Sequence, residues 1–124
     1  MKEKRPVFLD LTKIRFPPPA IVSILHRASG VIVFLLIPLL LWLLGASLAS
    51  EAQFQQLQTT LEQPGLRFFV WVVVSGLLFH LIAGIRHLIM DMGLGESLPV
   101  GRATAYVVIF LAAILIILTG IWLW

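Results

Sequence analysis

The chain has 124 residues, of which 60% are hydrophobic and 12% are charged, whereas soluble domains carry about 25% charged residues. Such a composition excludes an ordinary water-soluble domain. Cysteine is absent, which excludes disulfides, thiolate-bound iron–sulfur or zinc sites, and haem attached through a C-x-x-C-H motif.

Three charge-free runs cover residues 28–50, 68–85 and 103–124. As helices rising ~1.5 Å per residue, each can cross a hydrocarbon layer ~30 Å thick, the middle run by extending through Met90. We therefore predict an all-α integral membrane protein whose residues 1–124 form a single membrane-anchor domain. Its parts are an arm over residues 1–18 and helices over about 19–49, 66–91 and 103–124. No room is left for a soluble catalytic domain, so any chemistry lies within the helices or in partner subunits.

Basic residues are concentrated before the first span. Six of the nine Lys and Arg residues lie there: Lys2, Lys4, Arg5, Lys13, Arg15 and Arg27. The positive-inside rule predicts a cytoplasmic N-terminus, so the net charge of +3 indicates topology rather than nucleic-acid binding. The first 20 residues lack the apolar core of a signal peptide, and we expect no presequence. Residues 51–66 and the C-terminus would lie outside, where an interfacial belt would contain Trp42, Trp71, Trp122 and Trp124.

The first predicted helix begins near Pro19, because the fixed φ of proline suits a first helical turn. Pro38 lies in mid-span, where we expect it to bend the helix. At ~100° per residue, four positions near the cytoplasmic end share one face: Ser23, His26, Arg27 and Gly30. Their side chains could bind a carboxylate or a carbonyl. In the alternative interpretation, Arg27 extends to the lipid headgroups and its neighbours form a hydrated first turn.

The two connecting segments differ in character. In residues 51–66, Phe54, Leu57 and Leu61 recur at helical spacing within a glutamine-rich stretch. The pattern fits a short amphipathic helix in the membrane interface and, almost equally, an irregular loop. In the second connection, turns are expected at Gly93, Gly95 and Pro99.

The second predicted helix carries His80 deep in its apolar run, where an ionisable residue is costly and usually faces the bundle interior or a functional site. Gly76 and Gly84 lie one turn before and after it, and His87 returns to the same face. The glycines leave a flat surface that could accommodate a haem ligated by the imidazole. The alternative is a packing stripe, in which small residues let helices approach and the histidine hydrogen-bonds across the interface.

Three residues near the end of this helix are weaker candidates. His87, beside Arg86 and Asp91, is typical of a solvated helix end. Met90 and Met92 could ligate haem in principle, but methionines at a helix end more often fill gaps between apolar side chains.

Two stretches carry several distinctive residues at fixed offsets. The first is Arg5-Pro6 followed by Ser23-Ile24-Leu25-His26-Arg27-Ala28-Ser29-Gly30. The second begins at His80 and continues through Gly84-Ile85-Arg86-His87-Leu88-Ile89-Met90-Asp91-Met92-Gly93. Both resemble the signatures of the succinate dehydrogenase cytochrome b family. A match at this many offsets is more specific than one intramembrane histidine, so it favours the haem interpretation over the packing stripe.

The resemblance implies a role for each matched residue. His80 would be an axial ligand of haem b, and a second small membrane anchor subunit would supply the other ligand. His26 and Arg27 would lie near the haem propionates, while Ser23 and Arg27 would line the ubiquinone pocket. His87 would be a haem-edge or structural residue. The chain alone would have no catalytic residue.

The resemblance also implies partners and a location. A flavoprotein and an iron–sulfur subunit would pass electrons from succinate to the quinone, in the bacterial inner membrane. One alternative is the anchor of a fumarate reductase-type enzyme working with a low-potential quinol. A single-chain anchor with two bis-histidine haems would need four histidines, and the chain has three. The other alternative is a non-redox membrane scaffold subunit whose polar stripe only packs helices.

Overall fold

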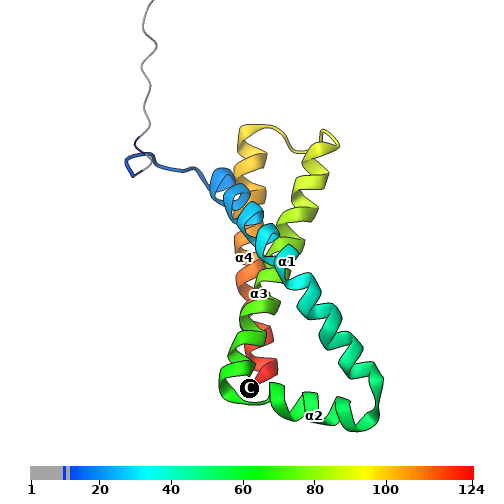
Figure 1. Cartoon of the computed structure of the whole chain (residues 1–124). Helices are drawn as coiled ribbons and strands as arrows, with labels where there is room; N and C mark the ends of the chain where they lie inside the picture. The colour runs from blue at the N-terminus through cyan, green and yellow to red at the C-terminus, as the bar shows by residue number, and fades with distance from the viewer. Residues whose placement is uncertain (1–9, 11) are drawn as a thin grey trace, which may run out of the picture.

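The computed structural model describes residue 10 and residues 12–124. Their ordered elements are the helices α1 (Pro18–Ala49), α2 (Glu51–Leu61), α3 (Pro64–Asp91) and α4 (Leu98–Leu123) (Figure 1). No strand occurs within these residues. Helices α1, α3 and α4 are each apolar and long enough to cross a membrane, which confirms the predicted all-α fold with three spans. The part of the first signature formed by Arg5 and Pro6, together with Lys2 and Lys4, lies outside the described residues.

Each of the three spanning helices has a proline in its first turn. Proline suits this position because its missing N–H would have no partner there. Helix α4 begins at Leu98, ahead of the predicted 103, because Pro99 stands in its first turn instead of in the loop. The prediction ended the loop at Arg102, but an arginine near a helix end can extend its charge to the interface. The loop turns at Gly93 and Gly95, whose φ angles of 80° and 74° favour glycine.

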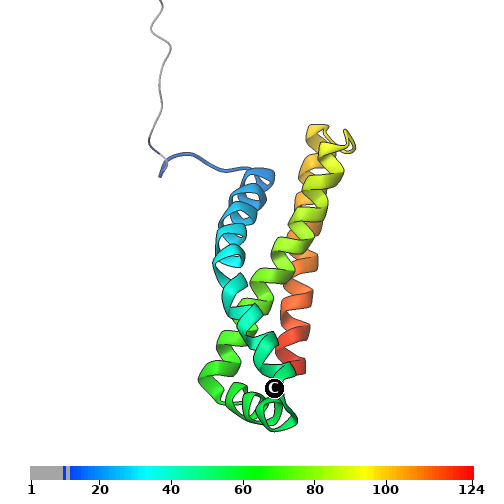
Figure 2. The ribbon, with the colours of Figure 1, turned by 45° about the vertical axis from the view of Figure 1, so that its right-hand side comes forward.

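Helices α3 and α4 run side by side and antiparallel, whereas α1 crosses this pair at an angle (Figures 1 and 2). Small side chains lie at the centre of the contact between α3 and α4, where Ala83 of α3 is buried against Ala105 and Val108 of α4. Val22 of α1 joins the same buried cluster. Small residues let helix backbones approach closely, which is how helices associate in a membrane. Helix α1 continues through Pro38, and the bend expected there stays a prediction.

The first connection contains the helix α2, as the amphipathic pattern predicted, and is not an irregular loop. The hydroxyl oxygen of Ser50 accepts a hydrogen bond of 3.1 Å from the N–H of Gln53 and so caps its first turn. The helix lies across the ends of α1 and α3, transverse to the spans (Figure 1). Between α2, α3 and the C-terminal half of α1 is an apolar hollow of about 380 Å³, to which Leu57 and Leu61 of α2 contribute. An orientation along the membrane surface follows if the long helices cross the bilayer.

The outer surface of the described chain is largely apolar. Five hydrophobic side chains are buried, and the buried set within the described residues includes no polar or charged side chain. Large apolar side chains such as Phe34, Leu35 and Phe110 are about 70% exposed. In a protein that spans a membrane, such surface contacts lipid or partner subunits.

Candidate functional site

A cavity of about 310 Å³ lies where α1 crosses α3, in the half of the bundle that carries the start of α1. Its lining from α1 consists of Val22, Ser23, His26, Arg27 and Gly30, and its lining from α3 consists of His80, Ala83, Arg86 and His87. The two groups are far apart in sequence. The structure therefore brings all four predicted site residues, Ser23, His26, Arg27 and His80, to one cavity.

The imidazoles of His26 and His80 stack across the crossing. Their ring centroids are 4.4 Å apart and their planes differ by 17°. The ring of His87 is tilted against that of His26, with centroids 5.8 Å apart. His26 and His80 are both partly buried. The stack places two polar rings against each other at a depth where an isolated ionisable side chain would be costly.

Each of these two rings packs against a glycine of the opposite helix. A Cβ atom on Gly30 of α1 would lie 3.1 Å from Cε1 of His80, and a Cβ atom on Gly84 of α3 would lie 3.2 Å from Nε2 of His26. A Cβ atom on Gly76 would meet nothing within 4 Å. The flat surface predicted on both sides of His80 is therefore open toward Gly76, whereas the ring of His26 fills the side toward Gly84.

Polar atoms of α1 contact the Nδ1 atom of His80. The hydroxyl oxygen of Ser29 lies 3.0 Å from this nitrogen, and the main-chain oxygen of His26 lies 3.3 Å from it. The Ser29 hydroxyl also donates a hydrogen bond of 2.8 Å to the same His26 carbonyl. The sequence placed Ser29 in the first signature without a role. Its contact depends on how α1 crosses α3, which no local pattern reveals.

Ser23 and Arg27 lie one turn apart on α1, line the cavity and are exposed. A serine hydroxyl can donate to a carbonyl oxygen, and a guanidinium offers several N–H donors in a planar fork. The pair is therefore accessible to an oxygen-bearing ligand that approaches this end of α1.

Arg86 also lines the cavity, and no separate role for it is expected from the sequence alone. Its Nε donates to Oγ1 of Thr104 and its Nη2 donates to the main-chain oxygen of Gly101, each at 3.0 Å. Both acceptors belong to α4, so this guanidinium links α3 to α4 beside the cavity. The second signature contained Arg86, but α4 carried no recognisable marker of its partner atoms.

His87 and the two methionines lie at the end of α3. Nε2 of His87 is 3.5 Å from Oδ2 of Asp91, and the two side chains are 63% and 60% exposed, as at a solvated helix end. Met90 lines a separate apolar hollow between α3 and α4, and Met92 is 69% exposed. Neither methionine lines the cavity that contains His80.

The donor set indicates which kind of metal site is compatible with the cavity. Across residue 10 and residues 12–124, no group of three or more His, Cys, Asp or Glu side chains is arranged to hold a metal ion. A haem needs only axial ligands from the protein, and His80 fits one such position. Its Nδ1 is engaged by α1, so Nε2 is the nitrogen that could bind iron, and no atom lies within 4 Å of a Cβ placed on Gly76, one turn before it.

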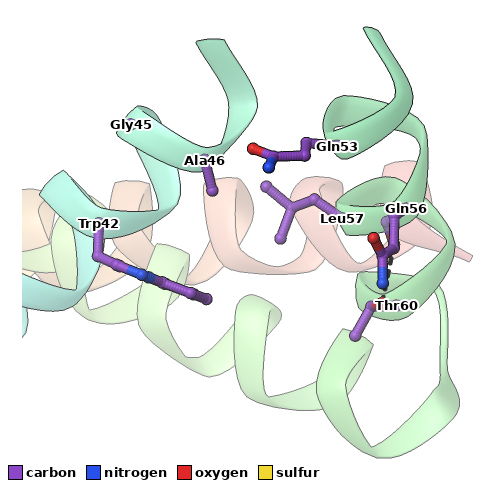
Figure 3. A pocket seen from close by; sticks show the side chains of 7 residues that line it. All are labelled: Trp42, Gly45, Ala46, Gln53, Gln56, Leu57 and Thr60. Carbon is purple, nitrogen blue, oxygen red and sulfur yellow. Dashed lines mark hydrogen bonds between the residues drawn. The ribbon is translucent and has the colours of Figure 1, made fainter. Parts of the chain in front are cut away.

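Another hollow, of about 570 Å³, lies between α1 and α2 at the other end of the bundle (Figure 3). Its lining residues are Trp42, Gly45, Ala46, Gln53, Gln56, Leu57 and Thr60. These seven residues include no ionisable side chain and no metal ligand. This hollow therefore offers no charged or metal-binding group comparable to those at the crossing of α1 and α3.

Known proteins match this chain over nearly its whole length. Residues 1–119 match the family described as "Succinate dehydrogenase/Fumarate reductase transmembrane subunit". The succinate dehydrogenase cytochrome b556 subunit of Coxiella burnetii is 50% identical, with 100% of both chains covered. Subunits of the same name from Rickettsia typhi and Paracoccus denitrificans are 30% and 29% identical over 93% of this chain, and 90% and 88% of their own lengths are covered. The chain therefore belongs to the family of succinate dehydrogenase/fumarate reductase transmembrane subunits.

Proposed function

We propose that this chain is the haem b-binding membrane anchor subunit of a succinate dehydrogenase and helps to form its ubiquinone reduction site. The strongest support is the single cavity that Ser23, His26, Arg27 and His80 line together. The name "cytochrome b556 subunit" of relatives that match over most of their length supports the same function. A haem-free scaffold is the alternative that the experiment below tests directly.

His80 would provide one axial ligand through Nε2. The second ligand would come from another small anchor subunit, because His26 is stacked on His80 and His87 is exposed at the helix end. When bound, the haem would supply a one-electron reservoir beside the quinone. His26 and Arg27, which line the same cavity, would bind the propionates, since a guanidinium forms paired hydrogen bonds with a carboxylate.

Ser23 and Arg27 would orient the quinone. Both are exposed at the cavity and can donate hydrogen bonds to one quinone oxygen. As that oxygen gains electron density, the fixed positive charge of Arg27 would stabilise it. If the N-terminus is cytoplasmic, as the basic arm predicts, the protons taken up by the quinone have a short path from the cytoplasm.

The remaining parts of the enzyme would come from partners. An iron–sulfur subunit at this end of the bundle would deliver electrons that a flavoprotein takes from succinate. The exposed apolar faces of the three spans provide surface for the second anchor subunit and for lipid. The relatives compared above are bacterial, which supports the bacterial inner membrane as the location.

The proposal is tested on the purified complex with three variants and one control. Wild-type complex reduced with dithionite should show a b-type α-band, and His80→Ala should weaken or remove it. Ser23→Ala and Arg27→Ala should keep the band and slow ubiquinone reduction by on the order of tenfold, the cost of about one strong hydrogen bond. Ser47→Ala is the control, because Ser47 is exposed and, within residues 12–124, its hydroxyl donates to the carbonyl of Leu44 in its own helix.

Two results would contradict the proposal. A wild-type complex without a b-type band would remove the haem assignment. Normal ubiquinone reduction in both the Ser23 and the Arg27 variants would remove the quinone assignment. Because the family description names succinate dehydrogenase and fumarate reductase together, the rates with ubiquinone and menaquinol are compared in the same preparation. A higher rate with menaquinol would favour the fumarate reductase type.

A further inference from the structure

The hydrogen atoms around Ser29 can be assigned from the acceptors that surround it. A serine hydroxyl has one hydrogen, and that of Ser29 points to the carbonyl of His26 at 2.8 Å. Its oxygen therefore presents a lone pair to Nδ1 of His80, 3.0 Å away. The second neighbour of this nitrogen, the His26 carbonyl at 3.3 Å, can only accept. We assign the hydrogen to Nδ1 of His80, because only that tautomer gives both contacts a donor.

This assignment determines which ring nitrogen is free. In a neutral imidazole with a hydrogen on Nδ1, the lone pair is on Nε2. The neighbouring Cε1 atom packs over Gly30, where an added Cβ atom would be only 3.1 Å away. The Nδ1–Cε1 edge of the ring thus lies against α1. Helix α1 therefore fixes both the tautomer and the rotation of the His80 ring.

We propose that Ser29 is a positioning residue for the haem ligand His80: its hydroxyl, oriented by the His26 carbonyl, accepts from Nδ1 and presents Nε2 to the iron. The inference rests on the proposed function, because it concerns the residue assigned there as the axial ligand. A hydrogen bond accepted from Nδ1–H makes the imidazole a stronger electron donor. A stronger donor favours ferric over ferrous iron, so Ser29 also lowers the haem reduction potential.

The test measures haem retention and midpoint potential in the purified complex, neither of which depends on turnover. In Ser29→Ala, haem affinity should fall by about tenfold or more, as for other residues that orient a metal-bound histidine. Retention is measured by incubation with excess apomyoglobin as the haem acceptor. The midpoint potential should rise, and a tenfold loss confined to the ferric state corresponds to about 59 mV for one electron.

Matched variants distinguish the hydrogen bond from a general effect of removing a serine. Ser47→Ala is the control within α1, because Ser47 donates to the carbonyl three residues before it, as Ser29 does. Ser47 is exposed, and in the part of the chain that the structure describes it has no hydrogen bond to another helix. It should leave both readouts unchanged. Ser29→Thr keeps a hydroxyl and should restore values close to wild type. Ser29→Cys offers a weaker acceptor and should give an intermediate shift; it provides the test if Ser29→Ala does not assemble.

The outcomes separate this inference from the proposed function. If the wild-type complex has a b-type band while Ser29→Ala and Ser29→Cys both keep wild-type retention and potential, the role of Ser29 is wrong and the haem assignment stands. An equal shift in Ser47→Ala would also overturn the role of Ser29. If the wild-type complex has no b-type band, the proposed function itself fails.

Discussion

The interfaces that α3 forms with the two other spanning helices, α4 and α1, consist of different kinds of side chain. Toward α4, the contact consists of small buried side chains such as Ala105, which is fully buried, and Val108. Hydrogen bonds from Trp71 to the Ile116 carbonyl and from Arg86 to α4 join the two helices at either end. Toward α1, the contact consists of imidazole rings, glycines, partly buried polar atoms and a cavity.

The difference indicates that the two sides of α3 have different roles. Trp71 and Ile82 lie about half a turn around α3 from His80, at ~100° per residue, whereas Ala83 lies between the two sides, since it is buried against α4 and also lines the cavity. One side of α3 is therefore close-packed and the other holds polar groups around an open space. Close packing between small residues stabilises helix pairs in membranes, whereas ionisable side chains at this depth are costly and mark functional sites. We infer that the α3–α4 pair is the scaffold and the α1–α3 crossing is the site.

The largest expected effect comes from overpacking the scaffold. Ala105→Phe places a large ring at a position that is 0% exposed, between α4 and α3. Overpacking of this kind costs about 1–3 kcal/mol or more, so the yield of assembled complex and its thermal stability in detergent should both fall clearly. Ala113→Phe is the matched control, because Ala113 lies on the exposed side of the same helix. Equal losses in both variants would show that the α3–α4 contact is not the stabilising interface.

A smaller effect, confined to the site, is expected from Gly30→Ala. The new Cβ atom would lie 3.1 Å from Cε1 of His80, so the ring must move by a few tenths of an ångström. We expect a shifted α-band or midpoint potential and a several-fold loss of haem affinity, with nearly normal assembly. Gly45→Ala is the control on the same helix, because a Cβ atom there meets nothing within 4 Å. A Gly30→Ala complex with wild-type spectrum and haem affinity would contradict the close approach of α1 to His80.

The spans were predictable because membrane crossing is a local property of the sequence. A charge-free run such as 28–50 satisfies the length requirement by itself, without knowledge of any other segment. The sequence does not distinguish a helix from a loop at α2, because short amphipathic patterns occur in both. The start of α4 differs from the prediction because Pro99, rather than the charge of Arg102, marks where the helix begins.

The site was predictable only in part, since its contacts depend on the register between helices. The residues on each face followed from helical spacing and from the two signatures, and they line one cavity in the structure. Helical spacing could not show that Gly84 faces the ring of His26, or that Ser29 contacts His80. These contacts arise from the crossing of α1 and α3, which involves residues about 50 positions apart.

The smallest expected effect comes from a single hydrogen bond between α3 and α4. Trp71→Phe keeps an aromatic ring but removes the N–H that donates to the Ile116 carbonyl at 3.0 Å. Interhelical hydrogen bonds in membranes contribute about 0.6 kcal/mol on average, so thermal stability in detergent should fall slightly and the haem spectrum should not change.

Gly120 packs beneath the indole of Trp71, and a Cβ atom on Gly120 would lie 3.1 Å from Nε1 of Trp71. Gly120→Ala should therefore cost less stability when combined with Trp71→Phe than alone. If Trp71→Phe changed the haem potential as much as Gly30→Ala, the two sides of α3 would be coupled. The distinction between a scaffold interface and a site interface would then be wrong.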